Sequence, residues 1–425
     1  MILSGATARA VLKRLGKFLD DFAGCFGRRA QREGASRYIQ GLLNDSERKS
    51  MQPMEARLPG NDAASYQRLQ HFISHSPWSE KKVWTRLRAA LPVRRGIVLV
   101  DETGLPKHGA QSVAVGRQYC GALGKIANCQ VAVSTALLAE QLAWPTTMEL
   151  YVPEDWAADD YRRARAEIPR TLRFRPKWRI GLAHVRQVRA AGIQIDGVLA
   201  DAAYGNVHAF RTGVDRMGLR YAVGVATRLT VKVAGARRRY PISRVVKQLP
   251  RRAWHRVCWA QGTKGPLAAR FAALRVRPTP RGPECWLLAE RPLTPRGERK
   301  AYLLNLPASA SLLELVRLAR GRWPIEQHYR ELKDELGLDH FEGRSYRAWN
   351  HHAVIAALTF TFLQRERRRG TKPLPTFPQV RNWVREIVAT LYFVETPRLM
   401  KLALSFLRDP PAMLHPRPTR AGRGG

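Results

Sequence analysis

Three acidic residues, far apart in the sequence, have the types and settings that metal-dependent phosphoryl transfer requires. Asp101 and Asp201 each end an apolar run that is typical of a strand, and Glu326 lies near the start of a stretch with helical character. Carboxylates at strand ends are rigidly aimed, as metal ligands must be. Two aspartates and a glutamate arranged in this way can hold two Mg²⁺ or Mn²⁺ ions, which prefer oxygen ligands.

Each acid also has an ordinary explanation. An aspartate after a strand is a common turn residue, and Glu326 with Arg330 could form an exposed helical ion pair worth a few tenths of a kcal/mol. A second matching strand end favours the metal-ligand interpretation of both aspartates. On an ideal α-helix Lys333 lies on the same side as Glu326, whereas Glu331 and Glu335 are rotated from it by about 140° and 180°. We therefore expect Glu326, among these glutamates, to be the ligand.

The charge of the chain indicates a polyanionic partner. Its 425 residues include 73 Lys and Arg against 34 Asp and Glu, which gives a formal net charge of +39. A codon bias toward arginine could inflate the basic count, but it does not explain so few acids. Residues 235–256 contain eight Lys or Arg and no acid. Nucleic acid is the commonest partner of such a surface, and a dense basic window is typical of phosphate contacts.

The spacing of apolar residues divides the chain into helical and strand-rich parts. Residues from about 8 to 92 have helical spacing interrupted by prolines. Three strands and then alternating helices and strands follow, which predicts a mixed sheet with helices outside it. The predicted strands are 97–101, 130–138, 147–152, 198–201, 220–225, 229–233, 273–277, 285–289 and 301–305, and the later helices are 177–191, 207–217, 311–368, 379–393 and 397–407.

The segment from Arg322 to Lys333 resembles the part of bacterial insertion-sequence transposases of the DDE type that contains their third acidic ligand. The family pattern is Tyr, Arg, Glu and Lys, with two, three and six residues between them. Arg322, Glu326 and Lys333 match this spacing. The tyrosine position is Ala319 in this chain, so the DNA contact that the family makes there is not expected.

This resemblance implies a fold, a chemistry and partners. Asp101 and Asp201 match the family's strand-borne first and second acids, so the resemblance implies an RNase H-like mixed sheet flanked by helices. The long gap between Asp201 and Glu326 is consistent with a β-rich insertion. The implied activity is cleavage of double-stranded DNA at transposon ends and joining of the 3′-OH to target DNA, with two Mg²⁺ or Mn²⁺ ions and a homodimer assembled on DNA.

The same expectations assign boundaries and DNA contacts. The expected parts are an N-terminal helical, DNA-binding domain at 1–92, the first part of the RNase H-like core at 93–225, the β-rich insertion at 226–306, the catalytic helix and the end of the core at 307–368, and C-terminal helices with a disordered basic tail at 369–425. The expected DNA-binding cations are Arg322, Lys333, Arg330, Arg237, Arg238, Arg239 and Lys107. A polar loop without a DNA contact is an equal alternative for the segment of Lys107, and a solvated basic loop is the alternative for Arg237–Arg239.

Other classes of protein share parts of this pattern. A non-enzymatic DNA-binding protein, such as an inactive or domesticated relative, would have the same charge. An RNase H-like nuclease would cleave without joining strands, and a basic RNA-binding protein would need no carboxylates. A metal-dependent nicking assay, a strand-joining assay and RNA competition separate these alternatives.

The sequence also indicates a cellular compartment. No apolar run reaches the roughly 18 residues of a membrane span, and the N-terminus has no basic segment followed by an apolar core. The five cysteines form no CxxC pair, so reduced thiols are expected. We therefore expect a cytoplasmic protein without a membrane partner, and the resemblance implies a bacterial, nucleoid-associated one.

The charge predicts that binding to duplex DNA is strongly salt-dependent. Lys and Arg side chains displace condensed counterions, so neutralising six or more phosphates should lower the affinity by roughly a thousandfold between 50 and 200 mM salt. Fluorescence anisotropy with a labelled duplex measures this dependence. An affinity that stays constant across the titration would contradict nucleic-acid binding.

Overall fold

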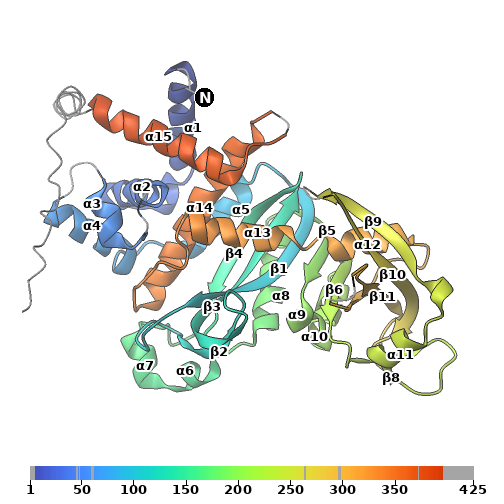
Figure 1. The fold of residues 1–425 in the computed structure, drawn as a ribbon. Coiled ribbons are helices and arrows are strands. Elements are labelled where there is room, and N and C mark those ends of the chain that lie inside the picture. The colour runs from blue at the N-terminus through green and yellow to red at the C-terminus, as the bar shows by residue number, and fades with distance from the viewer. Residues whose placement is uncertain are drawn as a thin grey trace, which may run out of the picture.

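The computed structural model describes residues 5–44, 46, 48–58, 62–262, 265–294, 298–371 and 373–395. Within these residues, twelve strands join in one mixed sheet (Figure 1). Its order is β2-β3-β1-β5-β6-β12-β11-β10-β7-β8, with β4 paired to β3 and β9 paired to β10. The strands are β1 (Arg95–Pro106), β2 (Gly116–Cys120), β3 (Lys125–Ala139), β4 (Leu142–Leu150), β5 (Gln194–Ala200), β6 (Tyr221–Val225), β7 (Thr230–Val233), β8 (Tyr240–Pro241), β9 (His255–Gly262), β10 (Gly265–Arg277), β11 (Cys285–Arg291) and β12 (Lys300–Leu304).

The first half of the sheet forms the core of the fold. Strands β4, β3 and β1 make an antiparallel meander, and β5 and β6 follow β1 in the parallel direction. The apolar side chains of Val98–Val100 and Val198–Ala200 are buried, as expected for strands covered on both faces. This arrangement confirms the predicted mixed sheet with flanking helices.

Different helices cover the two faces of this core. Helix α8 (Lys177–Ala190) packs against β1, β3 and β4, and its Gly181 lies against Val100. Gly321, just after α12 (Leu312–Arg320), lies against Leu199. Side chains alternate between the faces of a strand, and Leu199 pairs with Leu99, the neighbour of Val100. Helices α8 and α12 therefore lie on opposite faces.

Of the other described helices outside the N-terminal region, six are short and two, α14 and α15, are long. Helix α13 packs against β1 and β4, and α14 packs against β4. These helices are α6 (Glu154–Ala158), α7 (Asp160–Arg165), α9 (Ala202–Gly205), α10 (His208–Asp215), α11 (Ile242–Gln248), α13 (Pro324–Arg330), α14 (Tyr346–Arg368) and α15 (Phe377–Glu395).

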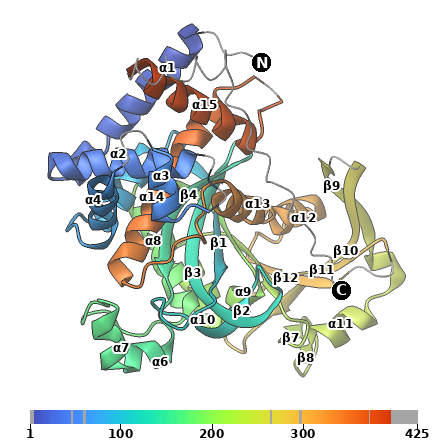
Figure 2. The ribbon, with the colours of Figure 1, turned by 60° about the vertical axis from the view of Figure 1, so that its left-hand side comes forward.

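A helical layer stands beside the sheet and is centred on α14 (Figure 2). Every residue of α14 from Ala348 to Gln364 is buried, as in a helix enclosed on all sides. The N-terminal helices supply much of that enclosure, which confirms the predicted N-terminal helices. They are α1 (Gly5–Asp20), α2 (Arg29–Leu43), α3 (Met51–Ala56), α4 (Ala63–Ser74) and α5 (Glu80–Ala90).

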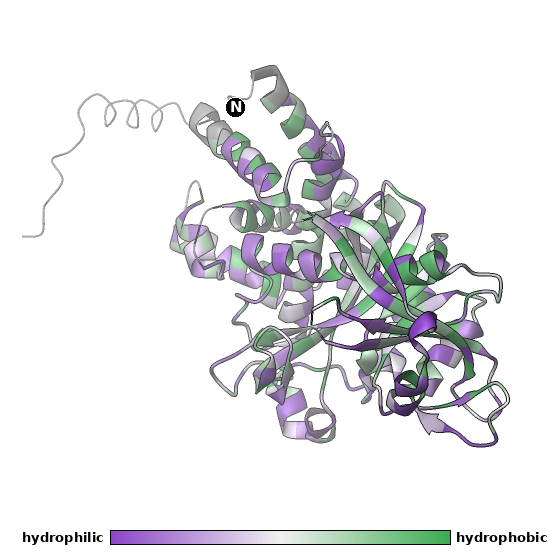
Figure 3. Cartoon of the chain, turned by 45° about the vertical axis from the view of Figure 1, so that its right-hand side comes forward, coloured by the Kyte–Doolittle hydropathy of each residue, from purple (hydrophilic) through white to green (hydrophobic). Residues whose placement is uncertain are grey.

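Residues 226–306 extend the core sheet. Strand β12 pairs antiparallel with β6, and β11, β10 and β7 continue outward from it. The predicted strands here are present, and β8, β9 and α11 are additional elements that the apolar pattern did not indicate. Figure 3 shows hydrophobic residues along much of the sheet. Because hydrogen bonding is continuous from β6 into β12, the boundary of a separate insertion stays a prediction.

The C-terminal part is described as far as residue 395. Helix α15 matches the helix predicted at 379–393. The helix predicted at 397–407 and the predicted disordered tail lie outside the described residues. Among the helices described here, none is both long and apolar enough to cross a membrane.

His352 connects α14 to the N-terminal helices. Its Nδ1 lies 2.8 Å from the Tyr38 hydroxyl, and its Nε2 lies 3.3 Å from the backbone oxygen of Leu338. A neutral ring protonated on Nε2 satisfies both contacts, because the tyrosine can donate and the carbonyl can accept. Burial lowers the pKa of His352 to about 4. Both this histidine and its neighbour His351 are buried within the helical layer.

The contacts of His352 predict that the helical layer is acid-sensitive. Because the folded pKa lies below the unfolded value of about 6.5, the stabilisation is complete above that pH and is lost as the pH falls toward 4. Because of His352, the free energy of unfolding should fall by about 1.4 kcal/mol for each unit that the pH decreases between about pH 6.5 and about pH 4. Urea melts at about pH 7 and about pH 5 should show a larger loss for the wild type than for His352→Gln. An equal loss in both proteins would contradict this account.

Candidate active site

Asp101 and Asp201 lie on neighbouring parallel strands. The register of β1 with β5 aligns Val100 with Ala200, and the two aspartates are the next residues. Asp201 follows the last residue of β5, and its Oδ1 accepts a hydrogen bond of 2.9 Å from the backbone N–H of Ala203. The prediction that Asp101 ends its strand is wrong. Strand β1 continues to Pro106 because β3 pairs with it along that whole length.

Asp101 is a buried carboxylate with strong neighbours. Only 7% of the residue is exposed. Its Oδ1 accepts a hydrogen bond of 2.9 Å from the backbone N–H of Glu102, and its Oδ2 accepts one of 2.6 Å from Arg322. Burial raises the pKa of Asp101 to about 7; Arg322 opposes this rise and the nearby Asp201 adds to it. A buried carboxyl with a strongly shifted pKa marks a candidate functional site.

Arg322 links Asp101 to Glu326. It lies in the short turn between α12 and α13, and Pro324 occupies the first position of α13, where proline fits well. Its Nη2 donates to Glu326 Oε1 at 3.1 Å, while its Nη1 binds Asp101. Burial lowers the pKa of Arg322, but the carboxylates of Asp101, Asp201 and Glu326 outweigh burial, so the pKa lies above its usual value. The turn therefore places Glu326, the third predicted acid, beside the arginine that also binds Asp101.

The helix that begins at Pro324 does not remain α-helical. After Arg330 the chain forms a π-helical turn over Glu331–Glu335, so α-helical rotation angles do not apply to Lys333. The Nζ of Lys333 donates to the backbone oxygen of Gly104 at 2.8 Å. Burial lowers the pKa of this lysine. Lys333 therefore contacts β1 at Gly104, which is three residues after Asp101 along that strand.

The two alternative glutamates are engaged elsewhere. Glu331 is buried, accepts a hydrogen bond of 3.0 Å from Gln327 and lies 3.8 Å from Arg367. Glu335 forms an ion pair of 2.7 Å with Arg381 of α15. Both carboxylates stabilise the packing of the helical layer, and neither has a described contact with the aspartates.

Two residues near Asp101 were not identified from the sequence. Ser134 is the partner of Asp101 in the register of β1 with β3. Its hydroxyl lies 2.7 Å from that of Tyr329, a buried residue of α13. Burial and then the charge of Asp101 raise the pKa of Tyr329 well above its usual value. Tyr329 lies one helical turn after Glu326, and that spacing could have indicated a shared face.

Ala319, at the position of the family's tyrosine, is a buried residue of α12 with 7% of its surface exposed. An alanine side chain at this position has neither a hydroxyl group nor an aromatic ring with which to contact DNA. Arg330, four residues after Glu326, is exposed at the end of α13. Unlike the buried Ala319, Arg330 is therefore accessible from the surface.

The other predicted cations lie away from the carboxylates. The Nζ of Lys107 donates to the backbone oxygens of Asp339 and Phe341 at 3.0 and 2.6 Å, which uses two of its three N–H donors. Arg237, Arg238 and Arg239 lie between β7 and β8. Strand β7 is six strand spacings from β1, roughly 29 Å measured along the sheet.

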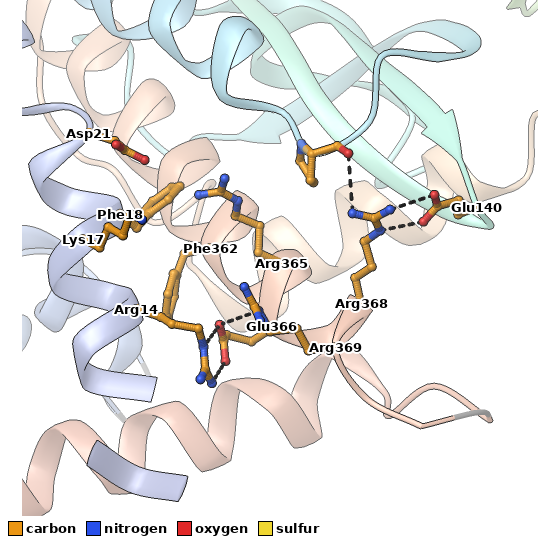
Figure 4. Close-up of a pocket in the computed structure, with 11 residues that line it drawn as sticks. Arg14, Lys17, Phe18, Asp21, Glu140, Phe362, Arg365, Glu366, Arg368 and Arg369 are labelled. Atoms are coloured by element: carbon orange, nitrogen blue, oxygen red, sulfur yellow. Dashed lines mark hydrogen bonds and ion pairs between the residues drawn. The ribbon is translucent and has the colours of Figure 1, made fainter. Parts of the chain in front are cut away.

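Figure 4 shows a basic hollow whose lining residues do not include the aspartates. It has a volume of about 680 Å³ and lies between α1, α14 and the turn after β3. Arg14 is paired with Glu366, and Arg368 is paired with Glu140. These ion pairs neutralise much of its charge, and the hollow contains none of the three predicted acids.

The aspartate pair suits a hard divalent cation. Asp101 and Asp201 offer carboxylate oxygens, and a cation between them would relieve the repulsion that helps to raise the pKa of Asp101. Within the described part of the chain, however, no group of three or more His, Cys, Asp and Glu side chains is arranged to hold a metal ion. Arg322 lies between Asp101 and Glu326 and donates a hydrogen bond to each of them.

Comparisons with known proteins identify a family. A family model described as "DDE superfamily endonuclease" matches residues 21–266. A second, described as "Transposase DDE domain", matches residues 179–362. Both matches include Asp201, and the first includes Asp101 while the second includes Glu326. These matches therefore cover the three acids between them.

One curated relative and one solved structure are also similar. The chain is 32% identical over 206 residues to the "Probable transposase for insertion sequence element IS701" of Microchaete diplosiphon, a match covering 47% of this chain and 50% of the relative. The chain thus spans about half the length of the curated relative. A cryo-EM structure of a piggyBac transposase synaptic complex with hairpin DNA aligns with 93% of this chain and 78% of that chain, at 11% identity and a TM-score of 0.45. That likeness is too low to support an inference.

The bond between Ser134 and Tyr329 predicts a measurable coupling. Tyr329→Phe and Ser134→Ala should each lower the free energy of unfolding by about 1 kcal/mol, because each leaves a buried hydroxyl or its partner unpaired. The double variant should lose less than the sum, since the second change removes a group that is already unpaired. A double-mutant cycle by urea denaturation measures the coupling. Strictly additive losses would show that the two hydroxyls do not interact.

Proposed function

Because the chain belongs to the DDE superfamily of endonucleases, we propose that it is an insertion-sequence transposase. In this proposal it cuts double-stranded DNA at the element's ends and joins the 3′-OH to target DNA. One observation supports the assignment most strongly: parallel strands place Asp101 beside Asp201, and Arg322 links Asp101 to Glu326. The relative from Microchaete diplosiphon, named as a probable transposase, supports the same activity.

The three acids are proposed to act as ligands for divalent metal. Asp101 and Asp201 would hold two Mg²⁺ or Mn²⁺ ions, with Glu326 as the third ligand, because these cations prefer carboxylate oxygens. Ions bound there would supply the positive charge that activates water for attack on the phosphodiester and that stabilises the departing 3′ oxygen. The family of the chain implies the use of divalent metal.

The protein's own residues would orient the DNA. Arg322 and Lys333 flank the aspartates from the turn before α13 and from the π-helical turn, so each could bind a phosphate of the reacting strand. Arg330 is exposed on the same segment and would contact the DNA farther from the reacting bond. Lys107 and Arg237–Arg239 would bind more distant phosphates.

The remaining assignments concern domains and assembly. The proposed parts are DNA-binding helices at 1–92, a catalytic core at 93–225 and 307–368, a β-rich insertion at 226–306 and a basic C-terminal region. Two copies would assemble on DNA, one at each end of the element. The +39 charge supports binding of long DNA segments beyond the site itself.

Replacing individual glutamates tests the assignment. Glu326→Gln should keep the fold and DNA binding but abolish metal-dependent cleavage, because a neutral amide is a poor ligand for Mg²⁺. Glu331→Gln and Glu335→Gln are matched controls that should still cleave, since their carboxylates contact Gln327 and Arg381 instead. Cleavage of supercoiled and end-containing DNA, followed by a strand-joining assay, measures both steps. Activity in Glu326→Gln together with its loss in either control would overturn the assignment.

A further inference from the structure

A single guanidinium engages two of the three candidate ligands. Arg322 donates to Asp101 Oδ2 at 2.6 Å and to Glu326 Oε1 at 3.1 Å. The arginine side chain is 28% exposed, while that of Asp101 is 10% exposed and that of Glu326 is 54% exposed. Arg322 therefore bridges a buried acid to one at the surface.

This bridge competes with a metal ion for the same oxygens. Oδ2 of Asp101 binds Arg322, and Oδ1 accepts from the backbone N–H of Glu102, so both oxygens already have partners. A divalent cation needs carboxylate oxygens within direct bonding distance, and it repels a guanidinium placed beside it. Metal held by Asp101 and Glu326 together is therefore bound more weakly while the guanidinium of Arg322 stays between these two carboxylates.

Bound DNA offers Arg322 another anion. A guanidinium pairs with phosphate in the same forked geometry that it uses with carboxylate. Arg322 lies in a turn rather than within a helix, and its neighbour Trp323 is 62% exposed, so this turn is open to the surface. A phosphate there could replace Asp101 and Glu326 as the partner of Arg322.

We infer that Arg322 is a positioning residue that holds Asp101 and Glu326 in the DNA-free protein and releases both carboxylates to metal when a DNA phosphate binds its guanidinium. The inference rests on the proposed function and adds to it a coupling between metal binding and DNA binding. Metal and DNA then bind cooperatively, and by linkage each raises the affinity of the other by the same factor. The metal site of the DNA-free protein is weakened in this scheme, and binding of DNA strengthens it.

Direct metal binding tests this role without relying on activity. Free Mn²⁺ is measured by electron paramagnetic resonance during titration of the full chain without DNA. Arg322→Gln should bind Mn²⁺ about tenfold more tightly than the wild type, because the carboxylates no longer have a competing partner. Arg317→Gln removes the same charge from an exposed position of α12 and should match the wild type. Arg322→Lys, whose single ammonium cannot bridge both carboxylates in the same way, should lie between them.

The titration is then repeated with duplexes taken from the DNA that flanks the coding sequence. DNA should raise the Mn²⁺ affinity of the wild type and change that of Arg322→Gln much less. Equal Mn²⁺ affinities of the wild type, Arg322→Gln and Arg317→Gln without DNA would overturn the inference. Asp101→Asn separates this outcome from failure of the proposed function. If it binds Mn²⁺ as the wild type does, with and without DNA, the proposed metal site itself is wrong.

Discussion

The parallel pairing of β1 with β5 is the constraint on which the site depends. Its register aligns Val100 with Ala200, so Asp101 and Asp201 follow at neighbouring positions of the same sheet. Two carboxylates this close repel one another, and burial of Asp101 removes water that would reduce the repulsion. Apolar residues that are buried on both faces of these strands hold the pairing in place. The packing of the sheet thus offsets a locally unfavourable arrangement of charge.

The charge of the site is opposite to that of the chain around it. Three acids meet a single guanidinium in a protein whose formal net charge is +39. A strongly basic surface attracts DNA from a distance, whereas a cluster of acids would repel its phosphates at close range. Arg322 offsets part of the negative charge of Asp101 and Glu326 in this structure, and divalent cations would do so during the proposed reaction. In our proposal the carboxylates have a positive partner both with and without DNA. That partner is Arg322 in the DNA-free protein and the divalent cations in the DNA-bound protein.

The sequence predicts where the strands and helices lie more accurately than it predicts the backbone geometry within them. The apolar runs 97–100 and 198–200 identified both strands, because buried parallel strands have few polar positions. The continuation of β1 beyond Asp101 depends on pairing with β3, which no local pattern records. The spacing of apolar residues predicts a helix past Arg330 but does not distinguish the π-helical turn at Glu331–Glu335 from an α-helix. The contact of Ser134 with Tyr329 joins segments 195 positions apart, so only the tertiary fold reveals it.

The most direct measurement of the central claim is the position of the metal. Crystals of the protein with DNA and Mn²⁺, measured at a wavelength where manganese scatters anomalously, locate the ion independently of any assignment. The account predicts an anomalous peak bonded to Asp101 and Asp201, with Glu326 nearby and Arg322 on a DNA phosphate. A peak bound to other residues, or one that leaves Arg322 paired with Asp101 and Glu326, would contradict it.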